Sequence, residues 1–192
     1  GNPPPGWGGR YFTFVKLTTD NGITGIGECY CATFGPVAMT AMIADTFGRY
    51  VEGMDPFHIE DLWRKVYGSG FTQRPDVSLM GVLSGIEIAL WDIIGKSVGK
   101  PVYELLGGRV QEKLRSYTYI YPDLAKGQDD SIYWNAEQSA ERAVHYMKLG
   151  FTAIKFDPAA PYSAFDPRQP SLESMELCTK FCRLIREAVG NK

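Results

Sequence analysis

The stretch FTAIKFD, residues 151–157, decides the fold because it has the pattern of a short strand and lies between two predicted helices. Before it, residues 135–150 (NAEQSAERAVHYMKLG) begin with a capping asparagine and end with a glycine, as helices do. After it, residues 171–190 (SLESMELCTKFCRLIREAVG) predict a second capped helix with one apolar face. A further strand, RSYTYIY at residues 115–121, precedes the first helix. This order of strand, helix, strand and helix predicts parallel strands joined by crossover helices, the unit of an α/β sheet or barrel.

Two parallel strands do not make a stable α/β domain by themselves, because their faces and edges stay uncovered. We therefore expect the α/β part to be incomplete in this chain. The remaining strand and helix units are expected from residues beyond Lys192 or from a partner.

The amino-terminal part of the sequence has a different character. Residues 11–28 (YFTFVKLTTDNGITGIGE) alternate in polarity around a turn and predict an antiparallel hairpin. Helical patterns follow at residues 36–51, 59–67 and 77–98. We therefore expect two domains, an α+β domain at residues 1–108 and the start of an α/β domain at residues 109–192.

The longest predicted helix, residues 77–98, contains small residues among its apolar ones. They are Gly81, Ser84, Gly85 and Ala89. Glycine weakens a helix, so its presence here predicts that the backbone of a neighbouring element approaches closely. This helix is expected at the centre of the packing.

Lys155 and Asp157 are the first candidate site residues. They lie two apart in the 151–157 strand, so their side chains share one face at its carboxyl end. The alternative is that Asp157, which precedes a proline, forms a turn and pairs with Lys155 as a structural ion pair.

The bulk composition excludes several classes of protein. The formal net charge is −2, with no basic cluster, which argues against nucleic-acid binding. No apolar run reaches the roughly 20 residues that span a bilayer, and the first residues do not resemble a signal peptide. We expect a cytoplasmic protein.

Three segments carry a resemblance to a known family. The hairpin VKLTTDNGITGIGE (15–28), the run SGIEIALWDIIGKSVGKPVYELLGGR (84–109) and the strand AIKFD (153–157) resemble, in order and spacing, the amino-terminal half of the enolase superfamily, in its mandelate racemase/muconate lactonizing enzyme subgroup. The resemblance implies an α+β capping domain followed by a modified TIM barrel, of which this chain holds the first βα units. It also implies a Mg²⁺ ion that stabilises an enediolate, with its ligands on strands beyond Lys192 and none assigned here.

The second barrel strand of this family usually carries a Lys-x-Lys motif. Lys155 matches the first lysine, which contacts the substrate carboxylate, whereas Asp157 stands where the second lysine acts as a base. An aspartate is a weak base near neutral pH, and it is better suited to accept a hydrogen bond from a substrate hydroxyl or to orient Lys155.

This departure implies an acid-sugar dehydratase, a lyase that removes the proton next to a carboxylate and then water, to give a 2-keto-3-deoxy sugar acid. Its main base is expected on later strands. The alternatives are a racemase or epimerase of a 2-hydroxy acid and a non-catalytic family member. The expected partner is a small sugar acid, and the expected assembly is a homo-oligomer.

Two loops match by position the family's mobile substrate loops, residues 28–35 and 68–76. With the end of the first barrel strand, they supply the predicted substrate-binding residues, which are Tyr30, Phe34, Gln73, Arg74 and Tyr121. Tyr119 and Tyr121 share a face at the end of this strand, and one of them is expected to point into the site. The alternatives are that the loop arginine is merely solvated and that the strand tyrosines pack in the core.

Four other ionisable residues are not expected in the site. Glu87 and Asp92 lie on the long helix, where we expect structural hydrogen bonds. His58 and His145 lie on helices outside every motif, so neither is expected as a general base.

Overall fold

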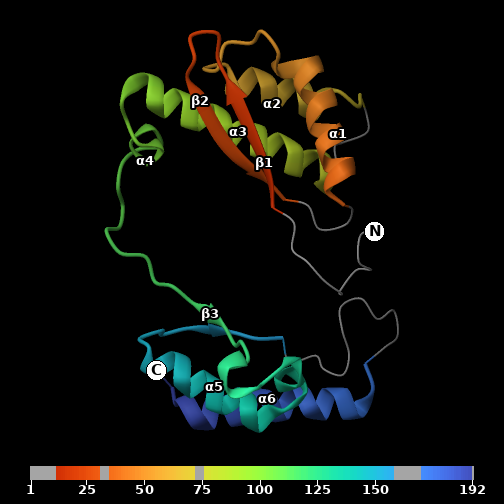
Figure 1. Cartoon of the computed structure of the whole chain (residues 1–192), viewed down its shortest axis with the longest axis vertical. Coiled ribbons are helices and arrows are strands. Elements are labelled where there is room, and N and C mark those ends of the chain that lie inside the picture. Colours follow the sequence, from red (N-terminus) through yellow and green to blue (C-terminus); the bar gives the residue numbers. More distant parts are fainter. Residues whose placement is uncertain (1–11, 31–34, 72–75, 158–169, 192) are drawn as a thin grey trace. The chain divides into compact units, whose positions relative to one another are not determined.

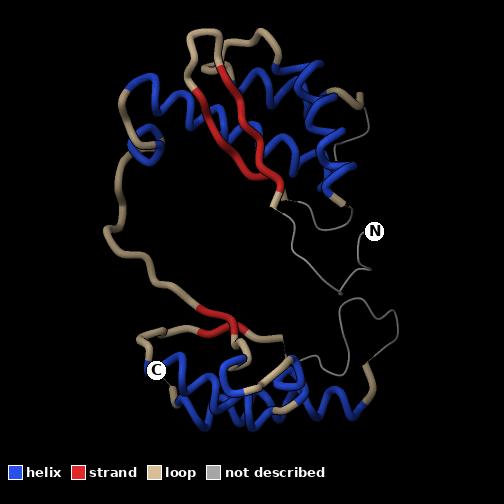
Figure 2. Tube along the Cα trace, viewed as in Figure 1, coloured by secondary structure: helices blue, strands red, loops and turns tan. Residues whose placement is uncertain are grey.

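The computed structural model describes residues 12–30, 35–71, 76–157 and 170–191 (Figure 1). The chain separates into two compact units, Gly1–Val110 and Gln111–Lys192, and each is described by itself below. Figure 2 shows that the described strands are few and that helices make up most of both units.

Unit 1 begins with the predicted hairpin. Strands β1 (Thr13–Thr18) and β2 (Thr24–Cys29) pair antiparallel, with Thr13 opposite Cys29 and Thr18 opposite Thr24. Gly22 closes the turn at a φ of 86°, a conformation that favours glycine. Alternate β1 residues are buried, so one face of the hairpin packs on the rest of the unit.

Three of the described helices of unit 1 begin where the sequence predicts, and a fourth, short helix is additional. They are α1 (Pro36–Thr46), α2 (Ile59–Gly68), α3 (Val77–Val98) and the short α4 (Val102–Leu105). The helical stretch predicted to Val51 does reach that residue, but Phe47–Val51 (η1) winds as a π-helix. The short α4 was not predicted.

Helix α3 is the centre of unit 1 and lies along β2 (Figure 1). Asp76 caps its start by accepting hydrogen bonds from the backbone N–H groups of Ser78 and Leu79. Gly99, with a φ of 66°, ends it in the left-handed conformation. The core of the unit forms on this helix and includes Met39, Leu62, Val82, Leu83, Ile86, Ala89 and Leu90.

The close approach predicted for the small residues of α3 is confirmed, and the neighbour is β2. A Cβ atom placed on Gly27 would lie 1.9 Å from the carbonyl oxygen of Gly85, and one on Gly25 would lie 2.0 Å from that of Ala89. Gly85 in turn has no room for a Cβ atom, which would lie 2.3 Å from Cys29 Sγ. The hairpin and the helix are therefore in backbone contact, which no larger residue permits.

Helix α3 also corrects one expectation from the sequence. Its 22 residues, with a mean hydropathy of 1.7 over an 18-residue window, are long and apolar enough to cross a membrane by length and composition alone. Nine of its residues are buried against the hairpin and the other helices. The helix is therefore the core helix of unit 1.

Unit 2 contains the predicted βα repeat. Strands β3 (Thr118–Tyr119) and β4 (Ile154–Lys155) pair parallel, and α5 (Ala136–Lys148) and α6 (Leu172–Val189) pack against each other. Asn135 and Ser171 cap the two helices as predicted. The core of this unit consists of Ile120, Ile132, Ala136, Ala140, Ala143, Phe181 and Ile185.

Both strands of unit 2 are shorter than the sequence pattern predicts. Each strand has a single strand neighbour among the described residues. The ladder between them contains two residue pairs, Thr118 with Ile154 and Tyr119 with Lys155. Backbone hydrogen bonds flank the two pairs, because Ile120 N–H donates to the carbonyl oxygen of Lys155 at 3.0 Å and Thr118 N–H donates to that of Ala153 at 3.3 Å. The Arg115 guanidinium also donates to the carbonyl oxygen of Thr152 at 2.5 Å. Two 3₁₀ segments that were not predicted, Leu124–Lys126 (η2) and Asp130–Trp134 (η3), join β3 to α5.

Candidate functional site

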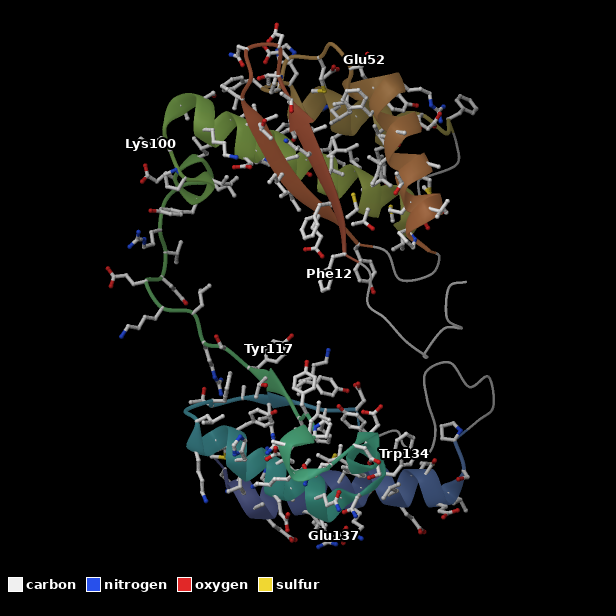
Figure 3. All side chains as sticks on the ribbon, in the orientation of Figure 1. Phe12, Glu52, Lys100, Tyr117, Trp134 and Glu137 are labelled. Atoms are coloured by element: carbon white, nitrogen blue, oxygen red, sulfur yellow. The ribbon has the colours of Figure 1, made fainter. Side chains whose placement is uncertain are left out.

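The carboxyl ends of β3 and β4 lie side by side and bring the candidate residues together. In the parallel register, Tyr119 is opposite Lys155. Side chains alternate along a strand, so Tyr121 and Asp157, two residues further on, belong to the same face. Figure 3 shows the side chains of this unit, with Tyr117, just before β3, and Trp134 labelled.

Tyr119 contacts both charged candidates. Its phenol O–H donates a hydrogen bond to Asp157 Oδ2. The Lys155 ammonium lies over its ring, 5.9 Å from the centroid, in cation–π geometry. The sequence pattern indicated that Tyr119 shares a face with Tyr121, but the contacts themselves depend on the strand register.

Two further aromatic rings hold Tyr119 in place. The ring of Tyr121 is 5.5 Å away, centroid to centroid, and that of Tyr133 meets it edge-on at 6.3 Å. We call Tyr119, Tyr121 and Tyr133 the tyrosine cluster. Distances of this size are typical of stabilising aromatic pairs.

Burial in the tyrosine cluster raises the pKa of Tyr119 well above its ordinary value, and the hydrogen bond to the Asp157 carboxylate raises it further. Both causes favour the protonated phenol. Tyr119 is therefore a hydrogen-bond donor throughout the neutral range.

The predicted alternative of a structural ion pair between Lys155 and Asp157 does not match the geometry. Among the ion pairs of the described residues, none joins these two side chains. Asp157 is held by Tyr119 instead, and both Lys155 and Asp157 are exposed. An exposed cation and an exposed anion that point from the same strand end can each bind a ligand group.

Arg142 anchors the segment that follows β3. Its guanidinium donates to the carbonyl oxygen of Tyr121 at 2.9 Å, to Asp123 at 3.1 Å and to the hydroxyl of Tyr146 at 3.3 Å. The residue is 9% exposed, so these bonds hold a buried charge. The sequence analysis did not single out Arg142, because its partners lie 19 and 21 residues away in the chain.

The predicted substrate-binding residues lie in different places. Tyr121 is 43% exposed beside Tyr119, and Tyr30 is 70% exposed directly after β2 in unit 1. Phe34, Gln73 and Arg74 lie outside the described residues. Their roles in substrate binding stay predictions.

The described residues do not fit a Mg²⁺ site. No group of three or more His, Cys, Asp or Glu side chains converges within this part of the chain. Asp157 offers a single carboxylate, and its Oδ2 already accepts a hydrogen bond from the Tyr119 hydroxyl. Mg²⁺ requires about six oxygen ligands.

The acidic residues of α3 have structural partners. Glu87 accepts hydrogen bonds from the indole N–H groups of Trp63 at 2.5 Å and Trp91 at 3.2 Å. Asp92 accepts one from the backbone N–H of Ile26 at 3.0 Å and pairs with Lys96 at 2.7 Å. Asp92 therefore ties α3 to the hairpin.

The two histidines belong to helical segments and not to the described strands. His58 directly precedes α2 in unit 1, and His145 lies near the end of α5, where its ring meets Tyr146 edge-on at 5.3 Å.

Comparison with known proteins adds three findings. The family model "Mandelate racemase / muconate lactonizing enzyme, N-terminal domain" matches residues 8–107. D-galactonate dehydratase from Xanthomonas oryzae pv. oryzae is 34% identical over 178 residues, which are 93% of this chain and 42% of that protein. D-galactonate dehydratase from Ralstonia pickettii is 41% identical over 120 residues, 62% of this chain and 29% of that protein.

A solved structure agrees with this similarity. The mandelate racemase/muconate lactonizing enzyme-like protein from Roseovarius sp. TM1035 superposes with a TM-score of 0.87 at 51% identity, over 98% of this chain and 48% of that one. The chain spans about half the length of these longer relatives, 42% of one and 48% of another.

Proposed function

This chain belongs to the mandelate racemase/muconate lactonizing enzyme family of the enolase superfamily, and from that membership we propose that the protein is an acid-sugar dehydratase. The reaction removes the proton from the carbon next to the carboxylate, and the hydroxyl of the following carbon leaves as water. The enol that results becomes a 2-keto-3-deoxy sugar acid when it takes up a proton at the third carbon.

One observation carries the proposal, namely that Lys155 and Asp157 leave the same strand end without pairing to each other. In the proposed complex, the Lys155 ammonium binds the substrate carboxylate, a charge-assisted contact. Asp157 Oδ1 accepts a hydrogen bond from a hydroxyl of the sugar chain, while Oδ2 keeps the hydrogen bond from the Tyr119 hydroxyl. A carboxylate is a poor base for a carbon acid, so in this proposal the proton goes to a group outside the described residues.

The similarity to D-galactonate dehydratases supports elimination over racemisation. Racemisation by two bases needs a proton acceptor on each side of the carbon, and Asp157 occupies the position of one of them. We therefore place the racemase or epimerase second.

The proposal includes Mg²⁺, which in this superfamily supplies charge stabilisation to the reacting carboxylate. Since the described residues offer no set of ligands, we expect those ligands beyond Lys192, on further strands of the barrel. We also propose that the protein is cytoplasmic and a homo-oligomer, with a small sugar acid as its partner and no nucleic acid or membrane.

A panel of sugar acids, incubated with the full-length protein and Mg²⁺, tests the proposal. The expected result is a 2-keto-3-deoxy acid from at least one of them, detected as its semicarbazone, and none after chelation of the metal. The reaction in D₂O distinguishes the rival function: exchange of the proton next to the carboxylate with no loss of water would identify a racemase or epimerase. Failure to bind Mg²⁺ by calorimetry would support a non-catalytic protein.

A further inference from the structure

We propose that Tyr119 is a positioning residue that keeps Lys155 and Asp157 from pairing with each other, so that the cation and the anion remain available to different groups of one ligand. The inference concerns the same site as the proposed dehydratase activity and rests on it for the identity of the ligand. Tyr119 lies on β3 and is not part of the motif that Lys155 and Asp157 form at the end of β4.

The first support is that Lys155 and Asp157 have the opportunity to pair. They lie two residues apart on one face of β4 and the segment that follows it, and both are exposed. A flexible lysine at this distance can reach the carboxylate and form an exposed ion pair, which is worth about 1 kcal/mol or less. No such pair is formed between these two described side chains, so a contact of modest strength is enough to keep them apart.

The second support is that one side chain contacts both. The Tyr119 O–H occupies Asp157 Oδ2, and the face of the same ring attracts the Lys155 ammonium, 5.9 Å from the centroid. The hydroxyl lies at the edge of the ring, whereas the cation lies over the face. The two charges are therefore bound at different parts of one rigid group.

The third support is that Tyr119 itself has little freedom. Its backbone is fixed opposite Lys155 by the parallel register, and its ring packs between Tyr121 and Tyr133. The phenol also keeps its proton, because burial and the Asp157 carboxylate both raise its pKa. A rigid donor that stays protonated at neutral pH fixes the direction of the carboxylate that it holds.

The consequence for a bound sugar acid is a division of roles. With Oδ2 occupied, Asp157 presents only Oδ1 to a hydroxyl, and Lys155 is free to take the carboxylate. Without the phenol, we expect Lys155 to swing to Asp157 and to compete with the substrate for that cation.

The test compares Tyr119→Phe, Tyr119→Leu and Tyr117→Phe in the full-length enzyme. Tyr119→Phe removes only the hydroxyl, and Tyr119→Leu removes the ring as well. Tyr117→Phe is the matched control, because Tyr117 lies just before the same strand and is 63% exposed. We expect the kcat/KM of Tyr119→Phe to fall about 10- to 100-fold, the range for one charge-assisted hydrogen bond, mostly through KM. Tyr119→Leu should lose at least as much, and the control should be unchanged.

A double-mutant cycle with Asp157→Asn separates positioning from a general structural role. If Tyr119 acts through the charge of Asp157, the loss caused by Tyr119→Phe should shrink in the Asp157→Asn background. Equal losses in both backgrounds, or a loss of thermal stability without a change in kcat/KM, would overturn the inference.

A crystal structure of the full-length Tyr119→Phe variant gives a result that does not depend on activity. We expect Lys155 Nζ and the Asp157 carboxylate at ion-pair distance there and apart in the parent protein. If the pair forms in the variant and no sugar acid is dehydrated by the parent, the proposed function fails and the role of Tyr119 stands. If the parent is active and the variant keeps both its kcat/KM and the separation, the role of Tyr119 fails and the proposed function stands.

Discussion

At the scale of single residues, the site depends on one contact across two strands. The sequence places Lys155 and Asp157 on one face, since side-chain alternation is a local property. It does not show that Tyr119 reaches both, because that contact depends on the register of β3 against β4. Local patterns therefore indicated the charged pair and the face of Tyr119, but they did not predict the contacts of Tyr119 with that pair.

Substitution of Lys155 tests its proposed contact with the substrate carboxylate. In Lys155→Ala, we expect kcat/KM for the sugar acid to fall by about 100-fold, since a charge-assisted hydrogen bond to the substrate is lost. Steady-state kinetics on the full-length enzyme measures this change. Lys148→Ala, at the exposed end of α5, is the control and should keep its kcat/KM. Unchanged kinetics in Lys155→Ala would remove Lys155 from the site.

The ionisation of Tyr119 provides a pH prediction. The pKa of Tyr119 is raised in the folded state, so its contribution to stability is complete below the unfolded value of about 10 and is lost as the pH rises through the folded value. A spectrophotometric titration of the phenolates should show one tyrosine that ionises later than exposed ones, and that late step should be missing in Tyr119→Phe. A late step that persists in the variant would assign it to another tyrosine.

At the scale of elements, the contact of β2 with α3 organises unit 1. The small residues of α3 predicted that some backbone lies close, and periodicity and caps predicted the helix itself. The sequence did not predict that β2 is this neighbour, because glycines such as Gly25 and Gly27 occur in turns and loops as well as in strands. Their role is clear only from their contacts with Ala89 and Gly85 of α3. The π-helical end of the first helical stretch, residues 36–51, and the two 3₁₀ segments were also beyond local patterns.

A methyl group at Gly27 should disrupt this contact. Gly27→Ala places a Cβ atom 1.9 Å from the Gly85 carbonyl oxygen, so helix and strand must separate. We expect the free energy of unfolding to fall by about 3 kcal/mol, as for an overpacked core. Gly48→Ala is the matched control, since no atom lies within 4 Å of its added Cβ, and its effect should stay within about 1 kcal/mol. Equal effects of the two variants would contradict the backbone contact.

Asp92 joins the same two elements by polar contacts and gives a second prediction. The Lys96 ammonium, followed by the backbone N–H of Ile26, lowers the pKa of Asp92. Its stabilising effect is therefore present above the unfolded value of about 3.9 and is lost as the pH falls through the folded value. Asp92→Ala should cost about 2 kcal/mol at pH 7, measured by urea unfolding, and the cost should decrease at pH 3.

Asp45→Ala is the control for this variant. Asp45 pairs with Arg49, four residues along an exposed helical face, so we expect a loss of about 0.5 kcal/mol or less. If both aspartates cost the same at pH 7, the bond from Asp92 to the hairpin does not stabilise unit 1.

At the scale of the whole molecule, the sequence predicted the family and the kinds of elements better than it predicted the site. The family membership is confirmed by the match over residues 8–107. The division into a capping domain at residues 1–108 and a truncated barrel at residues 109–192 stays a prediction, as do the Mg²⁺ ligands. Three of the five predicted substrate-binding residues, Phe34, Gln73 and Arg74, lie outside the described residues.

Metal binding by the full-length protein tests the predicted division of the site. We expect one Mg²⁺ per chain by calorimetry, with ligands beyond Lys192, and no activity after chelation. Asp157→Asn should keep the Mg²⁺ affinity while its kcat/KM falls, because Asp157 is assigned to a substrate hydroxyl and is not a ligand. If Asp157→Asn loses the metal, Asp157 is a ligand and its proposed role is wrong.

The backbone contact of β2 with α3 also has a consequence for how the nascent chain folds. An isolated hairpin is marginal in water, and the Asp92 bond that holds this one spans 66 residues. At a synthesis rate of roughly 5–20 residues per second, the ribosome delivers α3 on the order of several seconds after β2. During that interval the hairpin lacks the helix that covers most of its apolar face, so we expect a chaperone to bind the nascent chain most readily in this period.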